Sequence, residues 1–532
     1  MDVKAKISRF ASAVLRRPWI ATALLAFTMA AGWFGVSYPL GPGQDAHYHF
    51  FNAVVVSKLW TGDAYYRALY ETVNPLDSNT LLYTFLFPFE LALPPLTAWR
   101  VGFTLYYLVG YPLACALALH LLRRPMWGAL LAFPLAYAVK TFSQGGYLPF
   151  VSVAPLMVLA IALMHRINEG TSTRRMQVAC SAIVALAFIG HAHAYAWMMF
   201  LLATGTVVAM LLALVPGLLQ TPLRALLRAL SIGLRALLVV LPSLVLFGAW
   251  WMRTHHGSHA DAGWSLRPTM APMSAKVTSL WALLVAVPGD RELEFLLGLG
   301  IVVFACLALG RRRRETGVPT PELAVVLTFV SWWLLPADVS GQMVADRHMD
   351  LLVWLLPLAI YAGEPEGGRL RHALAVGTLV VYAWMRLTFY GQAMRQLQGE
   401  YAGMVTLAKT CPTPRGELAY VTSTATNAHW YGKGLHQTHE TFAALCALDT
   451  PVYDRVYPHN LLPLRYKSDL PVPITIGVGG ANHFWTASPS LERFDYVLVQ
   501  GWQPTPAEIA GVPAPWKLEG QSRGWSLWRR TR

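Results

Sequence analysis

The sequence predicts a polytopic α-helical membrane protein, with about eleven transmembrane helices and a small α/β domain at its C-terminal end. Hydrophobic residues make up 55% of the 532 positions and charged residues only 13%, whereas a soluble domain carries about 25% charged residues. The apolar residues lie in repeated runs close to the length of a bilayer-crossing helix, about 20 residues. Arginine and lysine collect in short segments on alternate sides of these runs, as expected of topology signals.

The first apolar run, Trp19 to Leu40, is interpreted as a retained anchor because no small-residue cleavage pattern ends it. The basic residues before it place the N-terminus in the cytoplasm. The next apolar stretch, Leu81–Leu96, is short and contains three prolines. It therefore predicts a helix on the outer membrane surface, not a crossing. The second span then runs from Trp99 to Leu122, which places Arg123 and Arg124 in the cytoplasm.

The remaining spans follow from hydropathy. They are predicted at 126–140, 147–165, 176–190, 194–215, 236–252, 293–310, 321–336, 350–363 and 372–390. The cytoplasmic loops between them carry most of the basic residues: Arg166, Arg174, Arg175, Arg224, Arg228, Arg235, Arg311 to Arg314, Arg369 and Arg371. The predicted organisation is a transmembrane domain over 1–390, with outer juxtamembrane helices in 41–98 and 253–292, and an extracytoplasmic domain over 391–532. The chain is thus expected in the cytoplasmic (inner) membrane, with its C-terminal domain periplasmic or extracellular.

The C-terminal region alternates strand and helix patterns. Glu417–Ser423 and Asp495–Gln500 have strand composition, Thr438–Ala447 has helical spacing, and the tryptophan pairs around Gly520 and Gly524 predict a closing hairpin. The domain has no Gly-rich phosphate loop, nucleophile elbow or CxxC motif. It is expected to bind an acceptor, to cover the membrane cavity, or to give structural support.

Two cysteines, Cys411 and Cys446, fall in this polar region. An oxidising compartment would allow them to form a disulfide, and two unrelated thiols are the alternative. The net charge of +14 is explained by the topology signals, so no nucleic-acid partner is expected.

The most informative polar segment follows the first span and contains Asp45, His47 and His49. In an extended stretch, alternation would place these three side chains on one face. A carboxylate at an outer membrane surface can deprotonate an acceptor hydroxyl, or help to hold a divalent cation. An ordinary interfacial loop is the alternative.

Other polar side chains are predicted at outer helix ends. His191 and His193 lie between two predicted spans, and Arg347 and His348 lie just before another. Lys140 and Arg253 are further candidates for contact with a phosphate, together with Arg347, and snorkelling at the interface is the alternative for each. Hydrogen-bonding histidines that line a polar cavity are expected in preference to a metal site.

The arrangement resembles the GT-C superfamily of membrane glycosyltransferases. The shared features are an acidic residue, Asp45, after the first span, a long outer loop with surface helices, the Asn74 to Arg100 stretch leading into the second span, the basic end of that span at Arg123-Arg124, many further helices and an outer C-terminal domain. The resemblance implies transfer of a sugar from a polyprenyl-phosphate-linked donor, at the outer face, to an acceptor glycan, lipid or protein. It also implies that Asp45 is the catalytic residue and that membrane lipids surround the chain.

The sequence departs from the superfamily at one point. Many relatives have a second acidic motif in the next outer loop, but here the loop from Lys140 to Tyr147 contains no carboxylate. The possibility of a metal-independent enzyme with Asp45 as the sole base therefore stays open. So does that of a non-enzymatic protein, either a transporter or an inactive scaffold of glycan assembly. A transporter would be expected to carry ionisable groups deep within its spans, and these spans have few.

Overall fold

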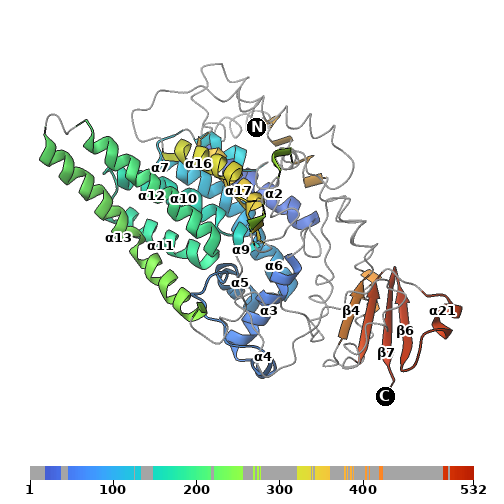
Figure 1. The fold of residues 1–532 in the computed structure, drawn as a ribbon. Coiled ribbons are helices and arrows are strands. Elements are labelled where there is room, and N and C mark those ends of the chain that lie inside the picture. Colours follow the sequence, from blue (N-terminus) through green and yellow to red (C-terminus); the bar gives the residue numbers. More distant parts are fainter. Residues whose placement is uncertain are drawn as a thin grey trace, which may run out of the picture.

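The computed structural model describes residues 18–36, 46–124, 126–133, 148–216, 221–255, 320–336, 342–359 and 504–531, together with 268–269, 272–274, 276, 338–339, 418–422, 495–500 and isolated positions between 377 and 407. Figure 1 shows that the described helices form one bundle and that a small sheet lies to one side of it. The helical segments of the bundle are α2 (Pro18–Val36), α3 (Ala46–Thr61), α4 (Ala64–Leu69), α5 (Leu81–Ala92), α6 (Pro95–Phe103), η1 (Thr104–Val109), α7 (Gly110–Leu121), η2 (Met126–Leu131), α9 (Leu148–Val151), α10 (Ala154–Asn168), α11 (Arg174–Gly190), α12 (Ala192–Leu214), α13 (Pro222–His255), α16 (Thr320–Leu334) and α17 (Val344–Ala359).

Four helical stretches among the described residues are long and apolar enough to cross a bilayer: Pro95–Leu121, Leu148–Asn168, Ala192–Leu214 and Pro222–Arg253. Three of them agree closely with predicted spans. Shorter apolar helices lie at Thr22–Gly35, Thr320–Leu334 and Asp350–Ala359. The chain is a polytopic helical membrane protein, and the total of eleven spans stays a prediction.

The helix α5 is separate from the second span. It has 12 residues, a rise of about 18 Å, which is too short for a hydrocarbon core of about 30 Å. Leu93 has extended backbone after it, and α6 begins at Pro95, next to Pro94. The break follows from the two prolines, because a residue before proline is driven out of the helical region.

The second span carries a ladder of aromatic rings on its buried face. Trp99, Phe103, Tyr107 and Tyr111 recur every fourth residue, and successive ring centroids are 6.0, 5.9 and 5.9 Å apart. The Tyr111 hydroxyl donates to the carbonyl oxygen of Trp354 at 3.1 Å, and the Trp354 indole donates to the Tyr107 hydroxyl at 3.3 Å. These bonds hold α17 against the second span.

The helix α13 is longer than predicted. The segment from Arg224 to Arg235 was expected to be a loop before a span at 236–252, but it belongs to a single 34-residue helix that begins at Pro222. Proline at the first helical position suits the geometry of a helix start. The basic residues of this segment therefore lie on a helix that extends the span.

The C-terminal sheet has the mixed topology expected of an α/β domain. Its strands are β4 (Leu418–Thr422), β5 (Tyr496–Gln500), β6 (Trp516–Ser522) and β7 (Trp525–Arg530), in the order β4-β5-β7-β6, and α21 (Pro506–Ala510) lies between β5 and β6. The pair β4–β5 is parallel and the other pairs are antiparallel. The hairpin turns at Arg523 and Gly524, both with positive φ, whereas Gly520 lies within β6 at a shift of register.

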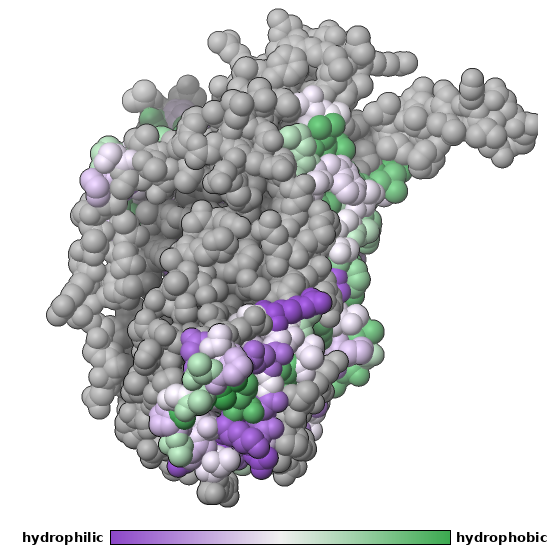
Figure 2. Space-filling model, turned by 90° about the vertical axis from the view of Figure 1, so that its right-hand side faces the viewer, coloured by the Kyte–Doolittle hydropathy of each residue, from purple (hydrophilic) through white to green (hydrophobic). Residues whose placement is uncertain are grey.

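The strands of this sheet differ in their exposure. Trp525, Leu527 and Trp528 are fully or almost fully buried, while Lys517, Glu519 and Gln521 alternate on the exposed side of β6. Figure 2 looks at the side of the molecule that carries the sheet, and hydrophilic side chains gather over its lower part. The predicted helix at 438–447 and the cysteines Cys411 and Cys446 lie outside the described residues.

A second, very small sheet joins the segment after α13 to the segment between α16 and α17. Its strands β1 (Pro268–Thr269), β2 (Asp338–Val339) and β3 (Gln342–Met343) are antiparallel. The strand β3 leads directly into α17. The segment that follows α13 is thus connected to the start of α17.

Candidate functional site

The junction between α11 and α12 is held by the segment between α4 and α5. The Ser78 hydroxyl accepts the backbone N–H of Ala192 at 2.8 Å, and the Thr80 N–H donates to the carbonyl oxygen of Ile189 at 3.0 Å. These bonds satisfy one donor at the start of α12 and one acceptor at the end of α11, groups that a helix end leaves open. His191 lies between them with extended backbone.

The close approach of α10 explains the residue before the junction. A Cβ atom on Gly190 would lie 2.8 Å from Cγ2 of Val153 and 3.4 Å from Cδ2 of Leu81. Real Cβ atoms do not come so close to another carbon. Glycine at this position lets α11 end directly against the start of α10. This contact determines the position of His191.

Imidazole and phenyl rings of three different segments meet beside this junction. The ring centroids of His191 and His193 are 6.4 Å apart, and those of His193 and His348 are 5.3 Å apart. Phe150 lies 5.2 Å from His191 and 6.4 Å from His193. The helices α9, α12 and α17 therefore contribute to one site, which we call the histidine–arginine cluster: His49, His191, His193, Arg347 and His348.

The start of α17 contributes the cation of the cluster. The Arg347 guanidinium lies 5.9 Å from the centroid of the Phe150 ring, and only 8% of the residue is exposed. His348 packs on Trp197, with ring centroids 4.5 Å apart, and its Nδ1 is 3.1 Å from the Ser331 hydroxyl of α16. The cluster thus holds a fixed positive charge among aromatic and imidazole rings.

The helix α3 adds a buried histidine. Nδ1 of His49 lies 2.8 Å from the Tyr83 hydroxyl of α5, which Asn52 also approaches at 3.5 Å. Burial lowers the pKa of His49 to about 3. The imidazole is therefore neutral at physiological pH.

His191 is also neutral. Burial lowers its pKa well below the ordinary value of a histidine, and the nearby charges of Arg347, His193 and His49 lower it further. A neutral imidazole can donate one hydrogen bond and accept another. The positive charge of the cluster consequently comes from Arg347.

Two ring nitrogens of the cluster lack partners. Nδ1 of His191 and Nε2 of His193 are buried, and neither has a hydrogen-bond partner among the residues that the structure describes. Buried polar atoms are nearly always satisfied. The two nitrogens are therefore placed to hydrogen-bond a polar ligand.

Arg253 is paired with a carboxylate. This residue, near the end of α13, forms an ion pair with Asp77, which precedes Ser78, and its side chain is half exposed. Asp45 and Lys140 lie outside the described residues, and so does the side chain of His47, although its backbone belongs to α3. The roles of these residues stay predictions.

A metal site gains no support from the described part of the chain. Within it, no group of three or more histidine, cysteine, aspartate or glutamate side chains is arranged to hold a metal ion. The neutral imidazoles instead point to hydrogen bonding. A divalent cation near Asp45 and His47 stays a prediction, because those side chains are outside the described set.

Several members of the site had not been singled out in the sequence. Tyr83, Phe150, Trp197 and Ser331 are ordinary residues of apolar or interfacial segments, and only the packing shows that they contact the cluster. Asp350 of α17 is fully buried. It follows Arg347 by three residues, a spacing that places both on one face of a helix.

The described chain folds as a helix bundle with a small C-terminal sheet. Two solved structures of ArnT from Cupriavidus metallidurans have this fold. The one bound to undecaprenyl phosphate is 13% identical with a TM-score of 0.52, and the match covers 95% of this chain and 97% of that chain. The one in the apo state is 12% identical with a TM-score of 0.52, and the match covers 98% of each chain. The resemblance to the GT-C superfamily that the sequence predicts is confirmed for the fold alone.

No protein-family model matches the sequence, and the comparison with curated proteins gives no match.

Proposed function

We propose that this chain is a membrane glycosyltransferase. It transfers a sugar from a polyprenyl-phosphate-linked donor to an acceptor glycan, lipid or protein at the outer face of the cytoplasmic membrane. The observation that supports this most is the histidine–arginine cluster beside the α11–α12 junction. It contains a buried guanidinium and two buried ring nitrogens that have no hydrogen-bond partner among the described residues. A lipid donor cannot leave the bilayer, so its phosphate needs a cation at membrane depth.

The residues of the cluster would have different roles. Arg347 would bind the donor phosphate, since guanidinium groups pair well with phosphate oxygens. The nitrogens of His191 and His193 would donate to phosphate or sugar oxygens. The aromatic rings of Phe150 and Trp197 exclude water, which strengthens these charge-assisted bonds. The solved ArnT structure bound to undecaprenyl phosphate supports a lipid phosphate as the ligand of this fold.

The proposed chemical step uses Asp45, the base expected from the sequence, together with the cluster. The Asp45 carboxylate takes the proton of the acceptor hydroxyl, whose oxygen attacks the anomeric carbon of the sugar. The bond between that carbon and the phosphate oxygen breaks, and the polyprenyl phosphate leaves with the electron pair. Arg347 stabilises the negative charge that develops on the leaving phosphate.

The test is transfer of sugar from a panel of polyprenyl-phosphate donors by the purified protein. Wild type is expected to transfer from at least one donor. Asp45→Asn is expected to lower kcat by at least about a hundredfold, because a positioned base contributes about that much. Arg174→Gln, at the other end of the bundle, is the matched control and should keep full activity. Parallel assays with Mg²⁺ and with EDTA report whether Asp45 and His47 hold a cation.

Two outcomes would contradict the proposal. Equal turnover by wild type and Asp45→Asn would remove Asp45 as the base. No transfer from any donor would favour a non-enzymatic role, as a transporter or as an inactive scaffold of glycan assembly.

A further inference from the structure

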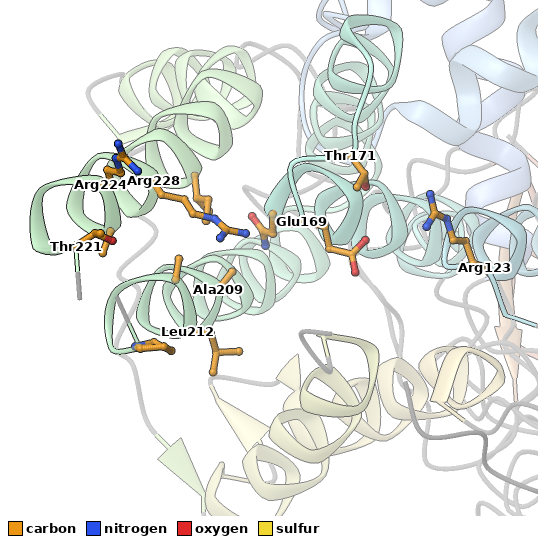
Figure 3. A pocket seen from close by; sticks show the side chains of 13 residues that line it. Arg123, Glu169, Thr171, Ala209, Leu212, Thr221, Arg224 and Arg228 are labelled. Carbon is orange, nitrogen blue, oxygen red and sulfur yellow. The ribbon is translucent and has the colours of Figure 1, made fainter. Parts of the chain in front are cut away.

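A second polar site lies at the opposite end of the bundle. The helix α12 begins next to His191 and runs for 23 residues, about 34 Å, to a pocket of about 640 Å³. The pocket is lined by the end of α12, the start of α13, the turn after α10 and the residue after α7 (Figure 3). It is therefore separated from the histidine–arginine cluster by roughly the thickness of a membrane core.

Arginines dominate the charge of this pocket. Arg123 lines it from the end of α7, and Arg224 and Arg228 line it from α13. In Figure 3, Arg228 extends from α13 toward the space between α12 and the turn that carries Glu169. Glu169 is the one carboxylate in the lining, and it is already paired, with Oε1 3.2 Å from Nε2 of His165 and Oε2 3.4 Å from Arg166. The pocket keeps an excess of positive charge.

The arginines of α13 lie between a buried face and an exposed face of the helix. At 100° per residue, Arg224, Arg228 and Arg235 fall within about 40° of one another. On one side of this stripe are packed residues such as Ala225 and Ile232. On the other are leucines whose exposure is high, including Leu223 at 68% and Leu227 at 57%. A cationic stripe next to an exposed apolar face is suited to the edge of a lipid leaflet.

One buried donor in the pocket wall lacks a partner. Asn168 is 4% exposed, and its Oδ1 accepts from the Thr206 hydroxyl at 3.3 Å. Its Nδ2 is buried and has no hydrogen-bond partner within the described part of the chain. Because buried amide donors are normally satisfied, this group indicates an acceptor that occupies the pocket.

We propose that the pocket binds the phosphate headgroup of an anionic phospholipid. Arg224 and Arg228 neutralise the phosphate, Asn168 donates to one of its oxygens, and the acyl chains lie along the exposed leucines of α12 and α13. The adjacent apolar surface favours a lipid over a free phosphate, which would gain nothing from it. The site does not depend on the proposed transferase activity.

The test measures binding to the full-length protein in a zwitterionic detergent. The thermal midpoint is followed while phosphatidylglycerol, phosphatidylcholine or inorganic phosphate is added. Phosphatidylglycerol is expected to raise the midpoint of wild type, and phosphatidylcholine is not. The double variant Arg224→Gln/Arg228→Gln should bind phosphatidylglycerol about 30-fold more weakly, since each arginine near an anionic headgroup contributes about a factor of five.

The matched control is Arg174→Gln/Arg175→Gln, which removes two exposed arginines of α11 that do not line the pocket. It should behave as wild type. Unchanged affinity of the double variant would overturn the proposal. A rise of the midpoint with inorganic phosphate equal to that with phosphatidylglycerol would show a free-anion site and overturn the lipid assignment. If the double variant does not fold, Arg228→Gln and native mass spectrometry of the retained lipid give the same decision.

Discussion

At the scale of single residues, the neutral histidines make the stability of the folded chain depend on pH. His49 has a pKa of about 3 in the folded chain and about 6.5 in the unfolded chain. Between these values the unfolded state takes up a proton that the folded state does not. The contribution of His49 to stability is therefore complete above pH 6.5 and is lost as the pH falls toward 3.

The variant His49→Gln tests this coupling. Wild type is expected to lose stability through His49 at about 1.4 kcal/mol per pH unit below pH 6.5. The variant lacks the titrating group, so the stability difference from wild type should shrink between pH 7.5 and pH 5. Thermal midpoints measured over this range check it. Parallel curves for the two proteins would mean that His49 is not held neutral by burial.

The sequence best predicted the site residues that are polar and lie next to apolar runs. His191, His193, Arg347 and His348 stood out because they lie at the ends of apolar runs, and the packing brings them together. Phe150 and Trp197 carried no such signal, since aromatic residues are common in membrane spans. Their contact with the cluster depends on tertiary packing between segments far apart in the sequence.

At the scale of elements, hydropathy located the ends of most described spans but not the start of α13. Arginines in a helix that extends beyond the hydrocarbon have the same hydropathy as arginines in a loop. The pair Thr221-Pro222 was the available signal, because threonine often caps a helix that begins with proline. The break at His191 was predicted between 190 and 194, where the apolar pattern is interrupted by two histidines.

The end of α16 depends on one buried cation. Nζ of Lys276 donates to the carbonyl oxygens of Trp332, Trp333 and Leu335, at 3.2, 2.5 and 2.8 Å. Lys276 is 3% exposed. A helix leaves its last carbonyl groups open, and a cation there also opposes the negative end of the helix dipole.

Replacement of this lysine by methionine should destabilise the protein. Lys276→Met keeps the length of the side chain but leaves buried carbonyl groups without a donor, at a cost of about 2–3 kcal/mol. A fall of several degrees in the thermal midpoint is expected. The matched control is Lys517→Met, on the exposed side of β6, which should leave the midpoint unchanged. An equal midpoint for Lys276→Met and wild type would show that the cation does not stabilise the helix end.

At the scale of the whole molecule, the two ends of the bundle differ in chemistry. One end carries the histidine–arginine cluster, and the other carries exposed arginines and the pocket at Asn168. The distribution of basic residues assigns the second end to the cytoplasm. The cluster and the C-terminal sheet would then share the outer side, where a lipid-linked sugar can meet an acceptor.

A reporter of membrane sidedness fused after Arg532 tests this orientation. It is expected on the outer side, and the same reporter placed before Met1 is expected in the cytoplasm. A cytoplasmic signal from the C-terminal fusion would break the prediction of eleven spans. It would also mean that Leu81–Leu96 could cross the membrane, although α5 is short.

The most direct test of the central claim is to locate a bound polyprenyl phosphate on the full-length chain. A photoreactive polyprenyl phosphate is crosslinked to the protein, and the labelled peptides are identified by mass spectrometry. Labelling is expected in peptides that contain Phe150, His191 to Trp197 or Arg347, and Arg347→Gln should lower it about tenfold, in line with one charge-assisted hydrogen bond. Labelling confined to the peptide from Thr221 to Arg235, at the opposite end of the bundle, would contradict the assignment of the cluster as the donor site.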